Sequence, residues 1–267
     1  MSSSNPPPQA HDAARLDAQH EAFTQYFDGK LGIAPLDGLR PSKIIELGCG
    51  SGAWAIQAAV QFPDAQIVAV DRAPPPEGIL PPTVTFQLAD LTKDLKFDAE
   101  TFDIVHARSV LIHVANAESV LRRASRLVKP GGLLLIEEAD VLSFGNSGGS
   151  ATRRFIGKVK EIQDSLGADV EFGRKVEGIV GALGTFEEVH VEKISLPFGG
   201  NGPDKALNQL GLGMKQSLAT ASGPLAKRFS DRGLTEEVAR EYNEEQERSD
   251  NESAMDFYLC WARRSLE

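Results

Sequence analysis

Hydrophobic residues along this chain alternate between short continuous runs and longer stretches with helical spacing. Continuous apolar runs are typical of parallel strands buried on both faces. Helical stretches lie between several of them, such as residues 52–62 and 117–129. This alternation predicts a doubly wound α/β fold. The strand runs are KIIELG (43–48), QIVAVD (66–71), VTFQLAD (84–90), FDIVHA (102–107) and GGLLLIEEAD (131–140).

Segments on either side of these strands complete the predicted organisation. Apolar residues recur at three- and four-residue steps within residues 15–27, which predicts an amphipathic helix. After residue 140 we expect a flexible loop at SFGNSGGS (143–150), further helices, a strand near 186–198 and a last strand near 255–266. The predicted parts are a disordered tail (1–11), an N-terminal helical cover (12–42), an α/β core (43–200), a helical insert or lid (201–252) and a final core strand (253–267).

Composition narrows the classes of partner. The 267 residues carry a formal net charge of −10, which would repel the phosphates of nucleic acids and anionic lipids. We therefore expect neither nucleic acid nor membrane as a partner. The two cysteines, Cys49 and Cys260, lack metal-ligand spacing, so neither a metal site nor a disulfide framework is indicated. The first residues lack the features of a secretory signal, which favours a cytoplasmic protein.

A glycine run joins the first strand to the following helix. Gly48, Gly50 and Ala53 match the G-x-G-x-x-G/A pattern, with Gly52 beside them, although this match alone is weak evidence. Glycines let a ligand approach the main chain, and the helix N-terminus offers unpaired N–H donors. Glu46 would meet the pyrophosphate of a nicotinamide cofactor unfavourably and instead favours a cationic ligand. S-adenosylmethionine, which carries a sulfonium and an ammonium group, is such a ligand.

Two further acids end neighbouring strands. Asp71 ends the second strand, where it can accept hydrogen bonds from both hydroxyls of a ribose. Asp90 ends the third strand, where it can accept from an adenine amino group, with Leu91 as an apolar wall. Each acid alone is equally consistent with a solvated strand terminus. Together with the glycine run they favour a nucleoside site, because open α/β sheets bind ligands at their carboxyl edge.

These segments resemble the class I S-adenosylmethionine-dependent methyltransferases. The likeness is carried by IIELGCGSG, VAVD, LAD, FDIVHARSVLIHV and RLVKPGGLLLIEEAD, and runs from about Lys43 to Asp140. It implies a Rossmann-like cofactor-binding core over residues 43–200, with a seven-stranded, mostly parallel sheet whose last strand is antiparallel. The prolines of RAPPPEGILPP exclude the helix that the family has between its second and third strands.

A narrower likeness lies outside the core motifs. RLDAQHEAFTQYFDGKLGIAPL, RAPPPEGILPP and FDIVHARS resemble fungal methyltransferases of secondary metabolism, a group that includes a regulator of such pathways. The resemblance implies that the N-terminal helix packs over the cofactor pocket.

The resemblance also implies a set of cofactor contacts. Tyr26 and Trp54 either wall the pocket or belong to the core. Arg108 either contacts the cofactor carboxylate or an acidic substrate, or forms a surface ion pair. The predicted cofactor-binding residues are Tyr26, Glu46, Gly48, Cys49, Gly50, Gly52, Trp54, Asp71, Arg72, Asp90, Leu91, Ala107 and Arg108.

His113 is the leading candidate for a general base, because it follows the fourth strand, where acceptor and cofactor should meet. The alternative is a histidine packed under the cofactor or bonded to a loop. His20, on the apolar face of the N-terminal helix, is a second candidate. Of Glu137, Glu138 and Asp140, which end the fifth strand, we expect one to face the substrate and the others to be solvated.

The sequence therefore predicts methyl transfer from S-adenosylmethionine to a small-molecule acceptor. The acceptor is expected to be a hydroxyl, carboxyl or amine of a natural product, with oxygen slightly favoured. Two alternatives stay open: a methyltransferase-like regulator that binds partners, and an enzyme that binds the cofactor but catalyses another reaction such as cyclisation. A nicotinamide oxidoreductase is disfavoured by Glu46 and by KPGG. The sequence does not indicate the oligomeric state.

Overall fold

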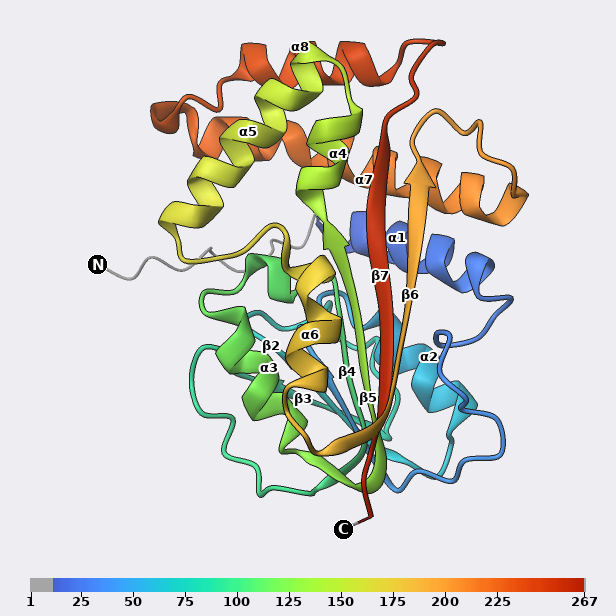
Figure 1. Cartoon of the computed structure of the whole chain (residues 1–267). Helices are drawn as coiled ribbons and strands as arrows, with labels where there is room; N and C mark the ends of the chain where they lie inside the picture. The colour runs from blue at the N-terminus through green and yellow to red at the C-terminus, as the bar shows by residue number, and fades with distance from the viewer. Residues whose placement is uncertain (1–11, 267) are drawn as a thin grey trace.

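A seven-stranded sheet forms the centre of the computed structural model, which describes residues 12–266. The strand order is β3-β2-β1-β4-β5-β7-β6, and β7 pairs antiparallel with both of its neighbours while the other pairs are parallel (Figure 1). The predicted fold class is confirmed. The predicted disordered tail, residues 1–11, lies outside the described residues.

The strands coincide with the apolar runs of the sequence. Buried residues dominate the central strands β1, β4 and β5, as expected for strands covered on both faces. The strands are β1 (Lys43–Leu47), β2 (Gln66–Asp71), β3 (Val84–Leu88), β4 (Phe102–Arg108), β5 (Val128–Asp140), β6 (Phe186–Pro197) and β7 (Ala254–Arg264).

Helices cover both faces of the sheet. Successive residues of a strand point to opposite faces, so Ile44 packs in the cluster that contains α2 (Ala53–Gln61), whereas Ile45 packs in the cluster that contains α3 (Ala117–Ser125). The helix α6 (Val176–Gly181) lies on the same side as α3 (Figure 1). The protein therefore has two apolar layers, one on each face.

A group of helices lies over the carboxyl ends of the strands (Figure 1). Phe23 is fully buried there, with its ring centroid 5.0 Å from that of Phe257 in β7. The helix that carries Phe23 also packs along α7, and Arg15 Nη1 donates to Ser217 Oγ of α7 at 2.8 Å. The N-terminal helix is therefore held between the sheet edge and α7. The helices are α1 (Ala13–Tyr26), α4 (Val141–Ser147), α5 (Ser150–Ser165), α7 (Lys205–Arg228) and α8 (Glu236–Gln246).

The segment expected as a flexible loop, residues 143–150, is largely helical, and that prediction is wrong. Asp140 caps the helix α4, because its Oδ1 accepts from the backbone N–H of Ser143 at 3.2 Å. Phe144 is fully buried, with its ring 4.4 Å from that of Phe198. Burial of this side chain outweighs the low helix propensity of the glycines and serines around it.

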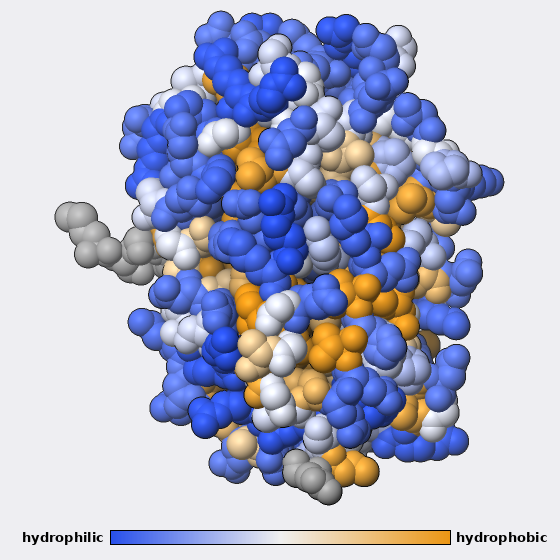
Figure 2. Space-filling view, viewed as in Figure 1, coloured by the Kyte–Doolittle hydropathy of each residue, from blue (hydrophilic) through white to orange (hydrophobic). Residues whose placement is uncertain are grey.

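Within residues 12–266, no helix has both the length and the apolar character needed to cross a bilayer. Hydrophilic residues cover most of the face in Figure 2, and apolar residues show mainly near its middle.

Candidate functional site

The glycine run forms the turn between β1 and α2 at the carboxyl edge. Gly48, Gly50 and Gly52 have φ values of +74°, +55° and +85°, a region that favours glycine. A Cβ at Gly48 would lie 2.2 Å from Val110 Cγ2, and one at Gly50 would lie 2.9 Å from Leu16 Cδ1. The positive φ favours glycine at both positions, and at Gly48 a Cβ would also clash with Val110.

Asp71 connects the end of β2 to the glycine turn. Its carboxylate accepts hydrogen bonds from the backbone N–H groups of Gly50 at 2.8 Å, Arg72 at 2.6 Å and Ala73 at 3.2 Å. Two carboxylate oxygens offer about four acceptor sites, and these bonds occupy three of them, so capacity for about one further donor is left. The side chain is half-buried, as a ribose ligand at the edge would need.

Asp90 lies at the end of the next strand. Its Oδ1 accepts from the backbone N–H of Thr92 at 2.9 Å and from Thr92 Oγ1 at 2.8 Å. Partial burial opposes ionisation, but these bonds and the nearby Arg72 hold the pKa of Asp90 below its usual value. Leu91 is buried, and its carbonyl accepts from Arg123 Nη2 at 2.7 Å. Asp90 is thus held as an anion beside an apolar side chain.

Glu46 lies beneath the glycine turn and is almost fully buried. Its Oε1 is 3.9 Å from His106 Nδ1, and its Oε2 has no hydrogen-bond partner among residues 12–266. Desolvation raises the pKa of Glu46 to about 8, although the Arg108 charge opposes the shift. A cation bound at this edge would favour the ionised form. The unpartnered buried oxygen fits a positively charged ligand.

His106 is a buried polar residue that the sequence reasoning missed. It is the β4 residue in register with Glu46, and its Nε2 is 3.8 Å from Glu137 Oε2 of β5. The ring stacks on Trp54, with centroids 3.7 Å apart. Burial lowers the pKa of His106, which keeps the ring neutral. A histidine inside the apolar run FDIVHA was the signal that could have found it.

Arg108 is not a surface cation. Its Nη1 lies 3.5 Å from Glu137 Oε2, and its guanidinium carbon is 4.7 Å from the centroid of the Phe23 ring. Its Nη2 is 2.5 Å from His20 Nδ1. Because a guanidinium only donates, His20 accepts through Nδ1 and is neutral. Burial, followed by the Arg108 charge, lowers the pKa of His20 to about 3.

His113 ends a short 3-10 turn, η2 (Leu111–His113), after β4. Its side chain is exposed to solvent. Desolvation, followed by the charges of Arg15 and Arg72, lowers the pKa of His113 to about 4. The ring is therefore neutral near pH 7 and able to accept a proton.

The acids that end β5 are buried, so the expectation that most of them are solvated is wrong. Glu137, Glu138 and Asp140 are 2%, 0% and 1% exposed. Glu138 Oε1 accepts from the backbone N–H groups of Val110 at 2.8 Å and Leu111 at 2.6 Å. Desolvation raises the pKa of Glu138 to about 8 despite these bonds. Glu138 thus fixes the turn that carries His113.

Two aromatic residues of the predicted cofactor-binding set, Trp54 and Tyr26, do not point into the glycine turn. Trp54 lies in the first turn of α2 and is buried, and its Nε1 donates to the carbonyl of Leu31 at 3.1 Å. Tyr26 lies about 15 Å along α1 from Leu16, given the helical rise. It is near Glu192 of β6, which with burial raises its pKa. The structure does not bring Tyr26 to the glycine turn.

Most of the predicted cofactor residues do meet at one edge. They come from the carboxyl ends of β1, β2 and β4 and from the segments that follow β1, β2 and β3. Within residues 12–266, no group of three or more His, Cys, Asp or Glu could hold a metal ion. The residues at this edge are Glu46, Gly48, Cys49, Gly50, Gly52, Asp71, Arg72, Asp90, Leu91, Ala107 and Arg108.

Comparison with known proteins decides the family. A family model described as "Methyltransferase domain" matches residues 18–175. The chain belongs to the methyltransferase family. Membership confirms the predicted enzyme class, with S-adenosylmethionine as the methyl donor.

Two fungal relatives support the narrower likeness. This methyltransferase is 41% identical over 212 residues to Methyltransferase str3 of Strobilurus tenacellus, which covers 78% of this chain and 76% of that protein. It is 35% identical over 251 residues to Methyltransferase str2 of the same organism, and this alignment covers 93% of this chain and 90% of that protein. The predicted likeness to fungal methyltransferases is confirmed.

A solved structure shares the fold. Phosphoethanolamine N-methyltransferase 2 of Haemonchus contortus, in complex with S-adenosyl-L-methionine, superposes with a TM-score of 0.55 at 17% identity, over 93% of this chain and 57% of that one. At this identity the likeness concerns the fold alone.

Proposed function

We propose that this methyltransferase transfers a methyl group from S-adenosylmethionine to a hydroxyl, carboxyl or amine of a small natural product, with oxygen acceptors favoured. One observation supports the site: a turn of three positive-φ glycines lies beside the strand-end carboxylates of Asp71 and Asp90. This arrangement offers carboxylate acceptors at the edge of the sheet where a nucleoside would bind. We expect no nucleic acid or membrane partner.

The residues present fit this cofactor. Asp71 would accept from a ribose hydroxyl, and Asp90 from the adenine amino group beside Leu91. Glu46, with its unpartnered Oε2, would lie beneath the cationic amino-acid end. Leu16 and Val110 lie over two of the glycines, so we expect both side chains to move when the site fills.

The cofactor supplies an electrophilic methyl group, and the chain's own residues orient the acceptor and exclude water. Methyl transfer by in-line displacement requires the acceptor atom, methyl carbon and sulfur to be collinear. The helices α1 and α7 cover the edge and keep it dry. When the acceptor is a hydroxyl, its proton has to leave as the new bond forms, and in this proposal neutral His113 accepts it. A carboxylate acceptor needs no such base.

Replacing His113 separates these acceptor classes. For a hydroxyl acceptor we expect His113→Ala to lower kcat about 100-fold or more, because a positioned base contributes on that order. The dissociation constant of S-adenosylmethionine should stay near that of the native protein. His190→Ala is the matched control, because His190 is exposed on β6 and stacks on Trp261. An unchanged kcat would rule out the base role and favour a carboxylate acceptor.

The proposed reaction itself is tested by mass spectrometry with a panel of hydroxyl, carboxyl and amine natural products. We expect one acceptor to gain a single methyl group while S-adenosylhomocysteine forms in equal amount. Cofactor binding without turnover on any acceptor would instead support a regulatory, partner-binding protein. A rearranged product without added mass, and without S-adenosylhomocysteine, would support a cyclase.

A further inference from the structure

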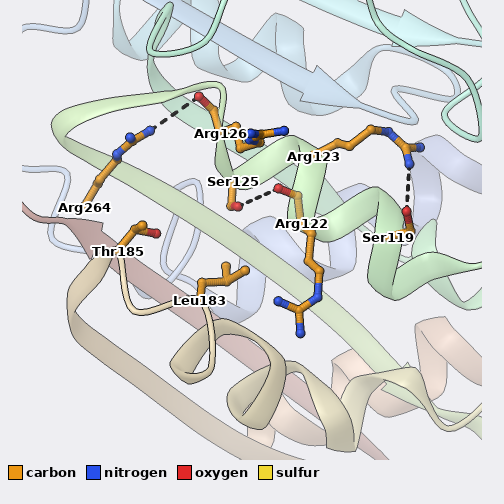
Figure 3. Close-up of a pocket in the computed structure, with 8 residues that line it drawn as sticks. All are labelled: Ser119, Arg122, Arg123, Ser125, Arg126, Leu183, Thr185 and Arg264. Atoms are coloured by element: carbon orange, nitrogen blue, oxygen red, sulfur yellow. Dashed lines mark hydrogen bonds between the residues drawn. The ribbon is translucent and has the colours of Figure 1, made fainter.

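A cavity of about 330 Å³ opens on the α3 side of the sheet, away from the glycine turn. Figure 3 shows its two walls, with the side chains of α3 on one and the turn before β6 with the end of β7 on the other. Arg264 and Phe186 are in register at the ends of β7 and β6, beside the amino end of β5. The cavity therefore belongs to the opposite edge from the proposed methyl-transfer site. Its lining residues are Ser119, Arg122, Arg123, Ser125, Arg126, Leu183, Thr185 and Arg264.

The lining of this cavity is cationic. Four of its residues are arginines and none is acidic, on a chain with a net charge of −10. Such a concentration of positive charge is opposite in sign to the net charge of the chain and would attract an anion. The question is how far the protein's own acids neutralise it.

Two of the arginines have acidic partners outside the cavity. Arg122 donates to Glu118 Oε1 at 2.8 Å, one turn earlier on the same helix. Arg264 donates to Glu100 Oε1 at 2.7 Å and to the carbonyl of Val128 at 2.6 Å. These acids reduce the local charge but do not cancel it.

The other two arginines have no acidic partner in the described part of the chain. Arg123 donates to Ser119 Oγ at 2.9 Å and to the carbonyl of Leu91 at 2.7 Å, both neutral acceptors. The guanidinium of Arg126 makes no hydrogen bond or ion pair within residues 12–266, and its side chain is exposed. Two positive charges thus remain uncompensated around one cavity.

The helix C-terminus explains only part of this cluster. Arginines at the C-terminus of α3 complement the negative end of the helix dipole, which accounts for Arg122 and Arg123 in the last turn and for Arg126 at the C-cap. It does not account for Arg264, which enters from β7 and whose guanidinium donates to the carbonyls of Arg126 and Val128 and to Glu100 Oε1. The hydroxyl-bearing residues Ser119 and Thr185 provide further groups able to donate.

A second cavity adjoins the first. Its volume is about 370 Å³, and it shares Ser119 and Arg123 with the first cavity. It extends along α3 to Asn116 and to Thr92, the residue that donates to Asp90. A ligand that contacts Arg123 would therefore touch a side chain that also holds the carbonyl of Leu91.

We propose that the arginine cavity binds a small polyanion with phosphate groups, such as a pyrophosphate or a phosphate ester. A guanidinium donates in a planar fork that matches the geometry of phosphate oxygens. A volume near 330 Å³ suits a small molecule, since ligand pockets start at about 300 Å³. The acidic surface of the rest of the chain argues against a nucleic acid as the occupant.

The test is calorimetric titration of the full-length chain with inorganic pyrophosphate at low ionic strength. We expect saturable binding that weakens as salt is added, because the contacts are ionic. Arg126→Ala should weaken binding about tenfold, since a hydrogen bond to a charged group contributes about 1.5–3 kcal/mol. Arg126→Lys keeps the charge but loses the planar fork of donors. Its affinity for pyrophosphate should lie between those of the native protein and Arg126→Ala.

Arg240→Ala is the matched control. Arg240 is an exposed arginine on α8 that pairs with Glu244, and its removal changes the net charge by the same amount. We expect pyrophosphate affinity to be unchanged in this variant, and both variants to keep the native unfolding temperature. No binding to the native chain, or equal weakening in both variants, would overturn the proposal. So would tight binding of an acidic peptide where pyrophosphate does not bind. These readouts do not use methyl transfer, so they stand or fall separately from the proposed function.

Discussion

Asp71 shows how one side chain serves both the fold and the site. Its carboxylate holds the glycine turn through Gly50 and is half-open to the edge, where the ribose is expected. The residue type and its position at a strand end could be predicted from the sequence. Its bonds to the glycine turn could not, because they depend on how the turn folds back over β2.

Replacing Asp71 should therefore weaken cofactor binding. We expect Asp71→Ala to raise the dissociation constant of S-adenosylmethionine about tenfold or more, because bonds to a charged acceptor contribute about 1.5–3 kcal/mol. Asp103→Ala is a suitable control in the same titration. Asp103 also accepts from backbone N–H groups, those of Ser42 and Lys43, but near the amino ends of the strands. Equal affinity in the native and Asp71→Ala proteins would refute the ribose assignment.

The buried residues beneath the turn mark the limit of what the sequence could predict. Glu46, His106 and Glu137 lie on three different strands and meet only because the sheet order places β1, β4 and β5 side by side. A local pattern identified Glu46 as a strand-end acid. No local pattern shows that two of its neighbours are a histidine and a second glutamate.

At the scale of elements, α1 is held to the core by a neutral histidine. His20 Nδ1 accepts from Arg108, and His20 Nε2 lies 3.3 Å from Thr24 Oγ1, which donates to Gln57 of α2. The helix was predictable from its apolar spacing. Its docking was not, because the partner residues lie far along the chain.

This docking should depend on pH. The pKa of His20 is lowered to about 3 in the docked state, from 6.5 when the side chain is free, so the docked helix binds fewer protons. Docking is therefore fully stabilised above about pH 6.5 and is lost progressively as the pH falls towards 3. Hydrogen exchange should show the amides of α1 becoming less protected between pH 7 and pH 5.

His20→Gln provides the comparison for this pH effect, because its amide oxygen can accept from Arg108 but does not titrate. We expect the protection of α1 in this variant to stay level over the same pH range. A parallel loss of protection in both proteins would assign the effect to other groups. These groups include Glu137, whose Oε2 is 3.5 Å from Arg108 Nη1, and the nearby Glu46 and His106.

At the scale of the whole molecule, the sheet places the candidate site residues at the carboxyl ends of its strands. The helices α1, α4, α5, α7 and α8, here called the cap, cover that edge (Figure 1). The seven-stranded, mostly parallel sheet and its antiparallel last strand followed from the family resemblance. The helix at residues 141–147 did not, because Phe144 packs on Phe198, more than fifty positions away in sequence. The cap leaves little room above Gly48 and Gly50, where Val110 and Leu16 lie.

Calorimetric titration with S-adenosylmethionine tests the central claim most directly, using the native chain and Gly50→Val. The native chain should bind the compound at one site and give no heat with NAD at the same concentration. Gly50→Val should not bind it while keeping its fold by circular dichroism, because φ is +55° at this residue and a Cβ would meet Leu16. Uptake of NAD in place of S-adenosylmethionine, or undiminished binding by Gly50→Val, would contradict a cofactor site at the glycine turn.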